Sequence, residues 1–218
     1  MLQIIATTLE LAAITSLILL MITPPLGWWL VQQRGWLSDS IAAITSLPLV
    51  LPPTVLGFYL LVCLGPEGPL APLLHFLGIR TLAFSFWGLV AGSVIYSLPF
   101  ALQPVRTSFA GIPPRLLEAA TCLRASNFDR FRSIALPLAR PGLISAAILS
   151  FAHTIGEFGV VLMIGGDIPG RTRVLSTMIF DAVETQDYAT ANAIAAGLLL
   201  FSFLAILALR RFDRDRGR

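Results

Sequence analysis

Residues 113–142 read PPRLLEAATCLRASNFDRFRSIALPLARPG, and this passage decides how the rest of the chain is organised. Its five arginines, one Glu and one Asp separate apolar stretches that are long enough to cross a bilayer. The whole chain has 218 residues, of which 56% are hydrophobic and only 12% are charged. Globular domains average about one quarter charged residues, so this composition predicts a polytopic membrane protein.

Five segments are apolar enough to be transmembrane helices, which require ~20 consecutive, mostly apolar residues. We expect these helices at about 6–31, 41–64, 82–102, 142–164 and 189–209. The predicted fold class is therefore an all-α polytopic membrane protein. We expect one transmembrane domain over residues 1–218, with its core at about 6–211 and a loop at 106–140 between the third and fourth helices.

The distribution of arginine sets the expected orientation. The chain contains no Lys, and twelve of its fifteen Arg lie in the first loop, in the 106–140 loop or in the carboxyl-terminal tail. The other three are Arg80, Arg171 and Arg173. Because basic residues concentrate on the cytoplasmic side, we expect the amino terminus outside and both the 106–140 loop and the carboxyl terminus in the cytoplasm.

The loop has the pattern of two short amphipathic helices. Pro114 suits the first position of a helix, and Glu118 lies in the first turns, where negative charge is favourable. Ser126 and Asp129 have the spacing of a capping box that begins a second helix, which we expect Pro137 to end. The residues alone leave two interpretations open: an interfacial element on lipid headgroups, or a docking surface for a cytoplasmic partner.

Two parts of the loop carry a resemblance. Glu118–Ala120, followed by Ile134–Pro137, resembles the EAA loop of bacterial ABC-importer permeases. Pro48–Leu61 and Gly156–Thr172 resemble the molybdate-type branch of that family. The similarity extends from about Leu9 to the last predicted helix and so covers nearly the whole chain.

The resemblance implies a homodimer in the bacterial inner membrane, surrounded by lipid, with two copies of a cytoplasmic ABC ATPase subunit and an external oxyanion-binding protein. The chain has no G-x-x-x-x-G-K-[ST] phosphate loop, so we expect no enzymatic activity of its own. No cofactor is expected on this chain, because ATP and Mg belong to the ATPase, and no nucleic acid is expected as a partner. The residues expected to contact the ATPase are Arg115, Glu118, Ala119, Ala120, Arg124, Phe128 and Arg130.

Arg124 departs from the family pattern, which has Gly at this position. Glycine permits a left-handed turn between the two short helices, whereas another residue enters that conformation at a cost of ~1 kcal/mol or more. Either the turn is built differently here, or the chain accepts the strain.

The second apolar segment carries three prolines, Pro48, Pro52 and Pro53. Each removes a backbone donor, so we expect irregular backbone there. Such backbone is tolerated in a membrane where protein or a water-filled cavity surrounds it. It is therefore either a simple kink or part of a pore wall near a gate.

His153 and Glu157 are expected one turn apart on the fourth helix. Glu157 is either a hydrogen-bonded structural carboxylate or a residue of the outer gate, because a carboxylate would repel a dianionic substrate. The hydroxyls of Thr54, Ser93, Ser97 and Thr154, together with backbone amides, are candidate transient donors to a substrate, and no metal site is expected. The residues expected along the pathway or gate are Pro52, Pro53, Thr54, His153 and Glu157.

The function that the resemblance implies is ATP-driven import of molybdate, with tungstate carried as well. A sulfate or thiosulfate importer is the alternative within the same family. A secondary transporter is a further alternative, but it would require an inverted repeat and membrane-buried charges. The sequence shows no repeat and essentially one deep carboxylate, Glu157.

Overall fold

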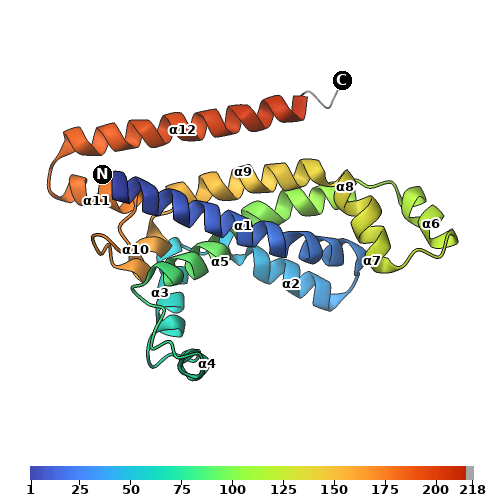
Figure 1. Ribbon diagram of the computed structural model, residues 1–218, viewed down its shortest axis with the longest axis horizontal. Coiled ribbons are helices and arrows are strands. Elements are labelled where there is room, and N and C mark those ends of the chain that lie inside the picture. Colours follow the sequence, from blue (N-terminus) through green and yellow to red (C-terminus); the bar gives the residue numbers. More distant parts are fainter. Residues whose placement is uncertain (215–218) are drawn as a thin grey trace.

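The computed structural model describes residues 1–214, and every regular element in that range is a helix (Figure 1). In chain order these are α1 (Leu2–Gln32), α2 (Trp36–Ser46), η1 (Leu47–Leu49), α3 (Pro53–Leu64), α4 (Ala71–Phe76), α5 (Phe86–Ala110), α6 (Pro114–Cys122), α7 (Asn127–Arg130), η2 (Phe131–Ala135), α8 (Leu136–Leu138), α9 (Arg140–Gly156), α10 (Gly159–Gly165), α11 (Leu175–Glu184) and α12 (Tyr188–Arg214). The predicted all-α fold class is confirmed. Two of the counted arginines, Arg216 and Arg218, lie outside the described residues.

Three long helices, α1, α5 and α9, pack along one another and form the centre of the molecule (Figure 1). Leu19 and Trp28 of α1 are buried in one cluster with Val105 and Phe109 of α5 and Ala146 of α9. This cluster lies toward the end of the bundle that carries the 106–140 loop, and it therefore connects the loop to all three central helices.

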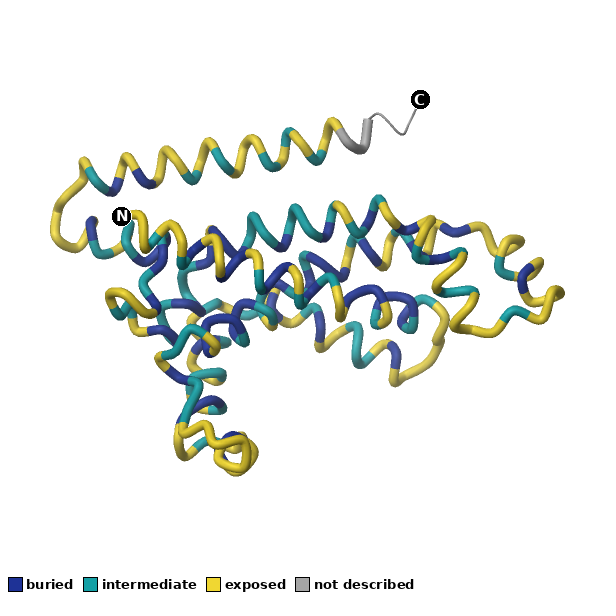
Figure 2. The backbone as a smooth tube through the Cα atoms, in the orientation of Figure 1, coloured by how far each residue is buried: buried dark blue, intermediate teal, exposed yellow. Residues whose placement is uncertain are grey.

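Three described helices, α1, α5 and α12, are long and apolar enough to cross a membrane, and the number rises to five if two bent pairs each count as one span. Helices α1 and α12 contain the expected segments 6–31 and 189–209 completely. Helix α5 contains the expected segment 82–102 except for residues 82–85, because α5 begins at Phe86. Helix α12 contacts α9 through Phe201, whose ring centroid lies 6.1 Å from that of Phe151, but its surface is exposed along most of its length (Figure 2). Exposed apolar side chains such as Leu199 and Phe203 suit contact with lipid.

The expected segment 41–64 is one of the bent pairs. The chain turns by 111° between the helical stretch Trp36–Leu49 and α3, which starts at Pro53. Pro52 precedes α3 with a ψ of 135°, because the residue before a proline is pushed out of the helical conformation. The irregular backbone predicted at these prolines is confirmed.

The expected continuous helix over 142–164 is wrong. Helix α9 ends at Gly156, Glu157 has extended backbone (φ −69°, ψ 132°), and α10 begins at Gly159. His153 and Glu157 therefore do not share one face of a helix. Glycines on both sides lower helix propensity, and the Glu157 carbonyl accepts a hydrogen bond from the Ser176 hydroxyl at 2.5 Å.

Helix α10 packs closely against α3 and α5 at glycine positions. A Cβ added to Gly57 would lie 2.8 Å from the Cβ of Met163, and one added to Gly92 would lie 2.5 Å from Cδ1 of Ile164. The Gly88–Gly92 spacing on α5, a G-x-x-x-G pattern, thus serves packing within one subunit.

The two ends of the bundle carry different elements (Figure 1). One end holds α6, α7, the connection between α1 and α2, and the carboxyl-terminal part of α12. The other end holds the amino terminus, α10 and α11. The arginine-rich connections therefore lie together at one end, and the loop that contains Arg171 and Arg173 lies at the opposite end.

Candidate coupling element and pathway cavity

The two short helices predicted in the loop are present, and we call residues 114–130 the coupling element. Helix α6 begins at Pro114, and α7 begins after Ser126. The Ser126 hydroxyl accepts a hydrogen bond from the Asp129 backbone N–H at 3.1 Å, and the Asp129 carboxylate accepts one from the Ser126 backbone N–H at 3.2 Å. The Ser126 hydroxyl also donates a hydrogen bond to the Asp129 carboxylate, and this bond, followed by the one from the Ser126 backbone N–H, lowers the pKa of Asp129 below its ordinary value of 3.8. The predicted capping box is confirmed.

The turn between α6 and α7 is built with Arg124 in the left-handed conformation (φ 59°). The Arg124 N–H bonds the Thr121 carbonyl at 2.9 Å, and the Ala125 N–H bonds the Ala120 carbonyl at 3.0 Å. This is the Schellman arrangement in which glycine normally occupies the left-handed position. The chain therefore keeps the turn that glycine would form and accepts the strain of an arginine side chain.

We expected Pro137 to end the second helix of the loop. Instead, the helical stretch continues past Pro137 to Leu138. A π-helical turn, η2, follows α7, and Pro137 lies in the first turn of α8. The wider π turn accommodates the proline ring, which would collide with the preceding turn of a regular α-helix. The stretch Asn127–Leu138 then meets α9 at an angle of 68°.

Aromatic packing fixes the coupling element to the bundle. The Phe131 ring centroid lies 6.0 Å from that of Trp28 on α1 and 6.2 Å from that of Phe109 on α5. Leu117 of α6 packs against the same cluster. The coupling element is therefore joined to α1 and α5 through Leu117 and through Phe131, the residue that directly follows it.

Most residues expected to contact the ATPase lie on the free surface of the coupling element. Those exposed are Arg115, Glu118, Ala119, Arg124 and Phe128. Ala120 is buried, and Arg130 is half-buried and bonded within the element. Leu123 is 84% exposed, although its helical spacing predicts that it shares one apolar stripe with the more buried Leu117 and Ala120.

The structure brings four of the five expected pathway residues together around one cavity of about 490 Å³, which we call the pathway cavity. Pro53 and Thr54 come from α3, His153 from α9, and Glu157 from the break between α9 and α10. The fifth, Pro52, caps the start of α3 and does not line the cavity. The remaining lining residues are Tyr96, Ala152, Gly156, Phe158 and Gly159.

His153 is held in place from several sides. Its Nδ1 lies 2.9 Å from the Ser97 hydroxyl, which lies 3.1 Å from the Thr154 hydroxyl. Its ring stacks on Phe100 with centroids 3.8 Å apart, and Tyr96 lies 5.1 Å away. Tyr96 and Phe100 were not expected in the site, although their i, i+4 spacing puts them on one face of α5.

Glu157 is only 4% exposed, and neither carboxylate oxygen has a hydrogen-bond partner among residues 1–214. The Ser93 hydroxyl lies near the carboxyl group but also lacks a partner of hydrogen-bond geometry there. The hydrogen-bonded structural carboxylate considered from the sequence is therefore not found in this part of the chain. Over the same residues, no three His, Cys, Asp or Glu side chains gather closely enough to hold a metal ion.

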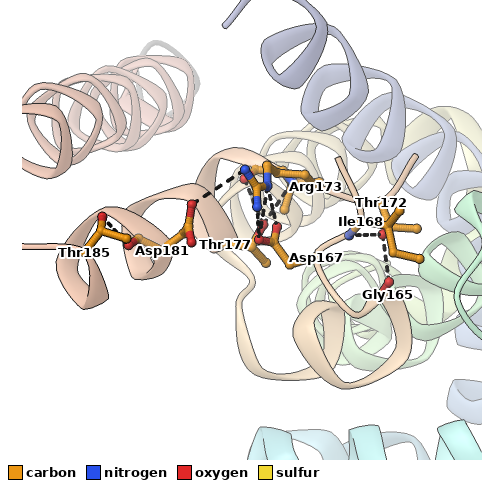
Figure 3. A network of polar contacts seen from close by, with 9 residues as sticks. Gly165, Asp167, Ile168, Thr172, Arg173, Thr177, Asp181 and Thr185 are labelled. Carbon is orange, nitrogen blue, oxygen red and sulfur yellow. Dashed lines mark hydrogen bonds and ion pairs between the residues drawn. The ribbon is translucent and has the colours of Figure 1, made fainter. Parts of the chain in front are cut away.

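A network of polar contacts joins the loop after α10 to α11 (Figure 3). Arg173 forms an ion pair of 2.9 Å with Asp167 and a longer one of 3.6 Å with Asp181 on α11. The Thr172 hydroxyl donates to the Gly165 carbonyl at 2.7 Å and accepts from the Ile168 N–H at 2.9 Å. Ser176 of α11 also donates a hydrogen bond to the backbone carbonyl of Glu157, which lines the pathway cavity. The network therefore supports the wall of the cavity that contains Glu157.

Known proteins share both the sequence and the fold. The family of binding-protein-dependent transport system inner membrane components matches residues 23–218. The molybdenum transport system permease protein ModB of Azotobacter vinelandii is 56% identical over 211 residues, which cover 95% of this chain and 93% of that protein. A sulfate transport system permease protein of Anthoceros angustus is 31% identical over 206 residues, which cover 94% of this chain and 71% of that protein.

The fold has solved counterparts as well. The inward-facing MetNI methionine ABC transporter matches with a TM-score of 0.73 at 20% identity, over 100% of this chain and 96% of that one. The match of the family to most of the chain, together with these relatives, leads to one conclusion: this chain is a member of the binding-protein-dependent transport system inner membrane components.

Proposed function

We propose that this chain is the membrane subunit of an ATP-driven importer that carries molybdate, and tungstate with it, across the bacterial inner membrane. The observation that supports this most is the 56% identity over nearly the whole length to a protein named for molybdenum transport. The sulfate permease is less similar, at 31%, and sulfate or thiosulfate import is the second candidate.

In this proposal residues 1–218 form a single transmembrane domain with five spans, the amino terminus outside and the carboxyl terminus in the cytoplasm. The bent pairs of helices and the separation of the arginine-rich end from the amino terminus support this arrangement (Figure 1). Two copies of the chain form the pathway between them. Two ATPase subunits bind the coupling elements and hold ATP and Mg, and an external oxyanion-binding protein delivers the substrate.

Force enters the membrane through the coupling element. Arg115, Glu118, Leu123, Arg124 and Phe128 present a mixed charged and apolar surface to the ATPase. Movement of this surface is passed to α1 and α5 through aromatic contacts and to α9 through the bend at its start. Helix α9 has 17 residues, so at about 1.5 Å per residue it carries the displacement roughly 25 Å toward the pathway cavity.

At the far end of α9 the rigid helix stops at Gly156, and the chain is extended at Glu157. We assign this break, together with Pro52, Pro53, Thr54 and His153, to the outer gate of the pathway. The broken backbone suits a gate because non-helical segments in a membrane line cavities or are covered by protein.

The experiment that tests the proposal is uptake of radioactive molybdate into proteoliposomes that contain this chain, its ATPase and its binding protein. We expect uptake to require Mg-ATP, to be inhibited by tungstate more than by sulfate, and to be unaffected when a protonophore collapses the proton gradient. Preferential uptake of sulfate would favour the second candidate. Uptake without ATP would contradict both.

A further inference from the structure

The carboxyl group of Glu157 is buried at the wall of the pathway cavity, and the described structure leaves it without a partner. It is 4% exposed, and neither of its oxygens is hydrogen-bonded within residues 1–214. Buried polar groups are normally hydrogen-bonded, because an unpaired one loses its contacts with water and gains nothing in return. An unpaired buried carboxyl group that lines a cavity therefore points to a ligand in that cavity.

The surroundings of Glu157 disfavour a negative charge. Glu157 lies between the carboxyl-terminal end of α9 and the amino-terminal end of α10, so the two helix dipoles oppose each other there, and it is the burial of the side chain that disfavours the charge. The ion pairs among the described residues join Arg173 to Asp167 and Asp181, and none reaches Glu157. The titratable groups that border the cavity besides Glu157 are Tyr96 and His153; α3 and α10 contribute no ionisable side chain to it, and α11 meets Glu157 through Ser176.

The substrate class of the proposed function requires hydrogen-bond donors. Molybdate and tungstate are tetrahedral dianions without protons near neutral pH, so their oxygens only accept hydrogen bonds. The lining of the cavity offers the hydroxyls of Thr54 and Tyr96 and the imidazole of His153. An ionised Glu157 would repel such a ligand, whereas a neutral carboxyl group would donate a hydrogen bond to it, a role that carboxylic acids in apolar sites are known to take.

We infer that the pathway cavity is a transient oxyanion subsite in which Glu157 presents a neutral carboxyl group as a hydrogen-bond donor. This inference rests on the proposed function and adds to it the place where the anion is held and the group that holds it. A carboxylate would repel a dianionic substrate, but the neutral carboxyl group of Glu157 carries no negative charge while the substrate occupies the cavity. Thr54 and Tyr96 supply further donors at the same cavity.

The test compares initial rates of molybdate uptake between pH 6.5 and 9 for the reconstituted complex and two variants. Glu157→Met removes the donor, and we expect uptake to fall by about tenfold or more, since buried groups that bind polar ligands contribute strongly. Glu157→Gln keeps a neutral donor of the same shape, and we expect it to restore most of the rate. The unaltered chain should lose uptake on the alkaline side as Glu157 ionises, and the Gln variant should not.

Glu67→Gln is the matched control, because Glu67 is exposed in the loop after α3 and distant in sequence from the cavity-lining residues. Assembly of each variant is checked by co-purification with the ATPase. If the Met variant does not assemble, the inference is tested by comparing the pH dependence of uptake between the Gln variant and the unaltered chain. Identical profiles, or loss of uptake in an assembled Gln variant, would overturn the inference. Failure of the unaltered complex to import molybdate would instead count against the proposed function.

Discussion

Arg130 of α7 donates a hydrogen bond of 3.0 Å to the Thr121 hydroxyl of α6 and also bonds the Asn127 side chain. This contact closes the corner between the two helices of the coupling element. The next residue, Phe131, packs against Trp28 of the central bundle. Arg130 and Phe131 therefore connect α6 to the bundle through this corner, and we propose that force applied to α6 follows the same route.

Replacing Arg130 with Ala should loosen this corner without unfolding the bundle. We expect faster hydrogen exchange at the amides of 114–126 and a several-fold lower uptake rate. Thr121→Val, which removes the acceptor, should give a similar effect. Because both changes remove the same bond, the double variant should be little worse than either single variant. Additive losses would show that the Arg130–Thr121 bond is not the relevant contact.

Glu118→Lys reverses a charge on the exposed face of α6. We expect uptake to be abolished and association with the ATPase to weaken, while insertion into the membrane stays normal. Co-purification with the ATPase measures the association directly. Glu184→Lys is the control, since Glu184 is exposed on α11 at the other end of the bundle. Survival of uptake in the Glu118 variant would refute the docking role of this surface.

Arg124→Gly should relieve the strain of the left-handed turn. The gain in local stability should be up to about 1 kcal/mol, reduced by the greater freedom of glycine in the unfolded chain. Hydrogen exchange of the coupling element measures this free energy. Arg115→Gly is the matched control, because glycine inside α6 should destabilise the helix by about 1 kcal/mol. Equal effects of the two changes would mean that the turn is not strained.

Gly57→Ala should disturb the contact between α3 and α10, since the new Cβ would lie 2.8 Å from the Cβ of Met163. Overpacking of this kind costs about 1–3 kcal/mol. A lower midpoint of thermal unfolding in detergent would report it. Gly197→Ala on α12 is the control, because nothing lies within 4 Å of the added Cβ. An unchanged midpoint for the Gly57 variant would show that α3 and α10 separate freely.

The capping box predicts a local dependence on pH. The pKa of Asp129 is lowered by hydrogen bonds from the Ser126 side chain and backbone. The carboxylate therefore stabilises the start of α7 above its ordinary pKa of 3.8, and this contribution is lost as the pH falls through the lowered value. Carbon-13 NMR titration of the Asp129 carboxyl should show the shift, and Ser126→Ala should reduce it. A value at or above 3.8 in the unaltered chain would contradict the cap.

The coupling element was predictable because its determinants are local. Pro114 at the first helical position, and the Ser126–Asp129 pair three residues apart, act on their own backbone and need no distant partner. The exposure of Leu123 was missed because the reversal of direction at Arg124 carries it away from the inward stripe.

The break at Glu157 was not predictable from the run of apolar residues. No proline interrupts 142–164, and the hydrogen bond that holds the extended backbone comes from Ser176, on a different helix. The chemistry of the cavity was partly readable, because His153 and Glu157 are unusual in an apolar segment. Tyr96 and Phe100 resemble ordinary aromatic residues of a membrane helix, and only the packing of α5 against α9 reveals their contact with His153.

We propose that a cytoplasmic ATPase drives this bundle through the coupling element, and site-specific crosslinking at the exposed turn detects that contact. A photoreactive residue in place of Leu123, which is 84% exposed, would be activated in native membranes. We expect one major adduct with the ATPase subunit, and we expect its yield to change when ATP is hydrolysed. Crosslinking to an external protein, or labelling of this position from outside intact cells by a membrane-impermeant reagent, would contradict it.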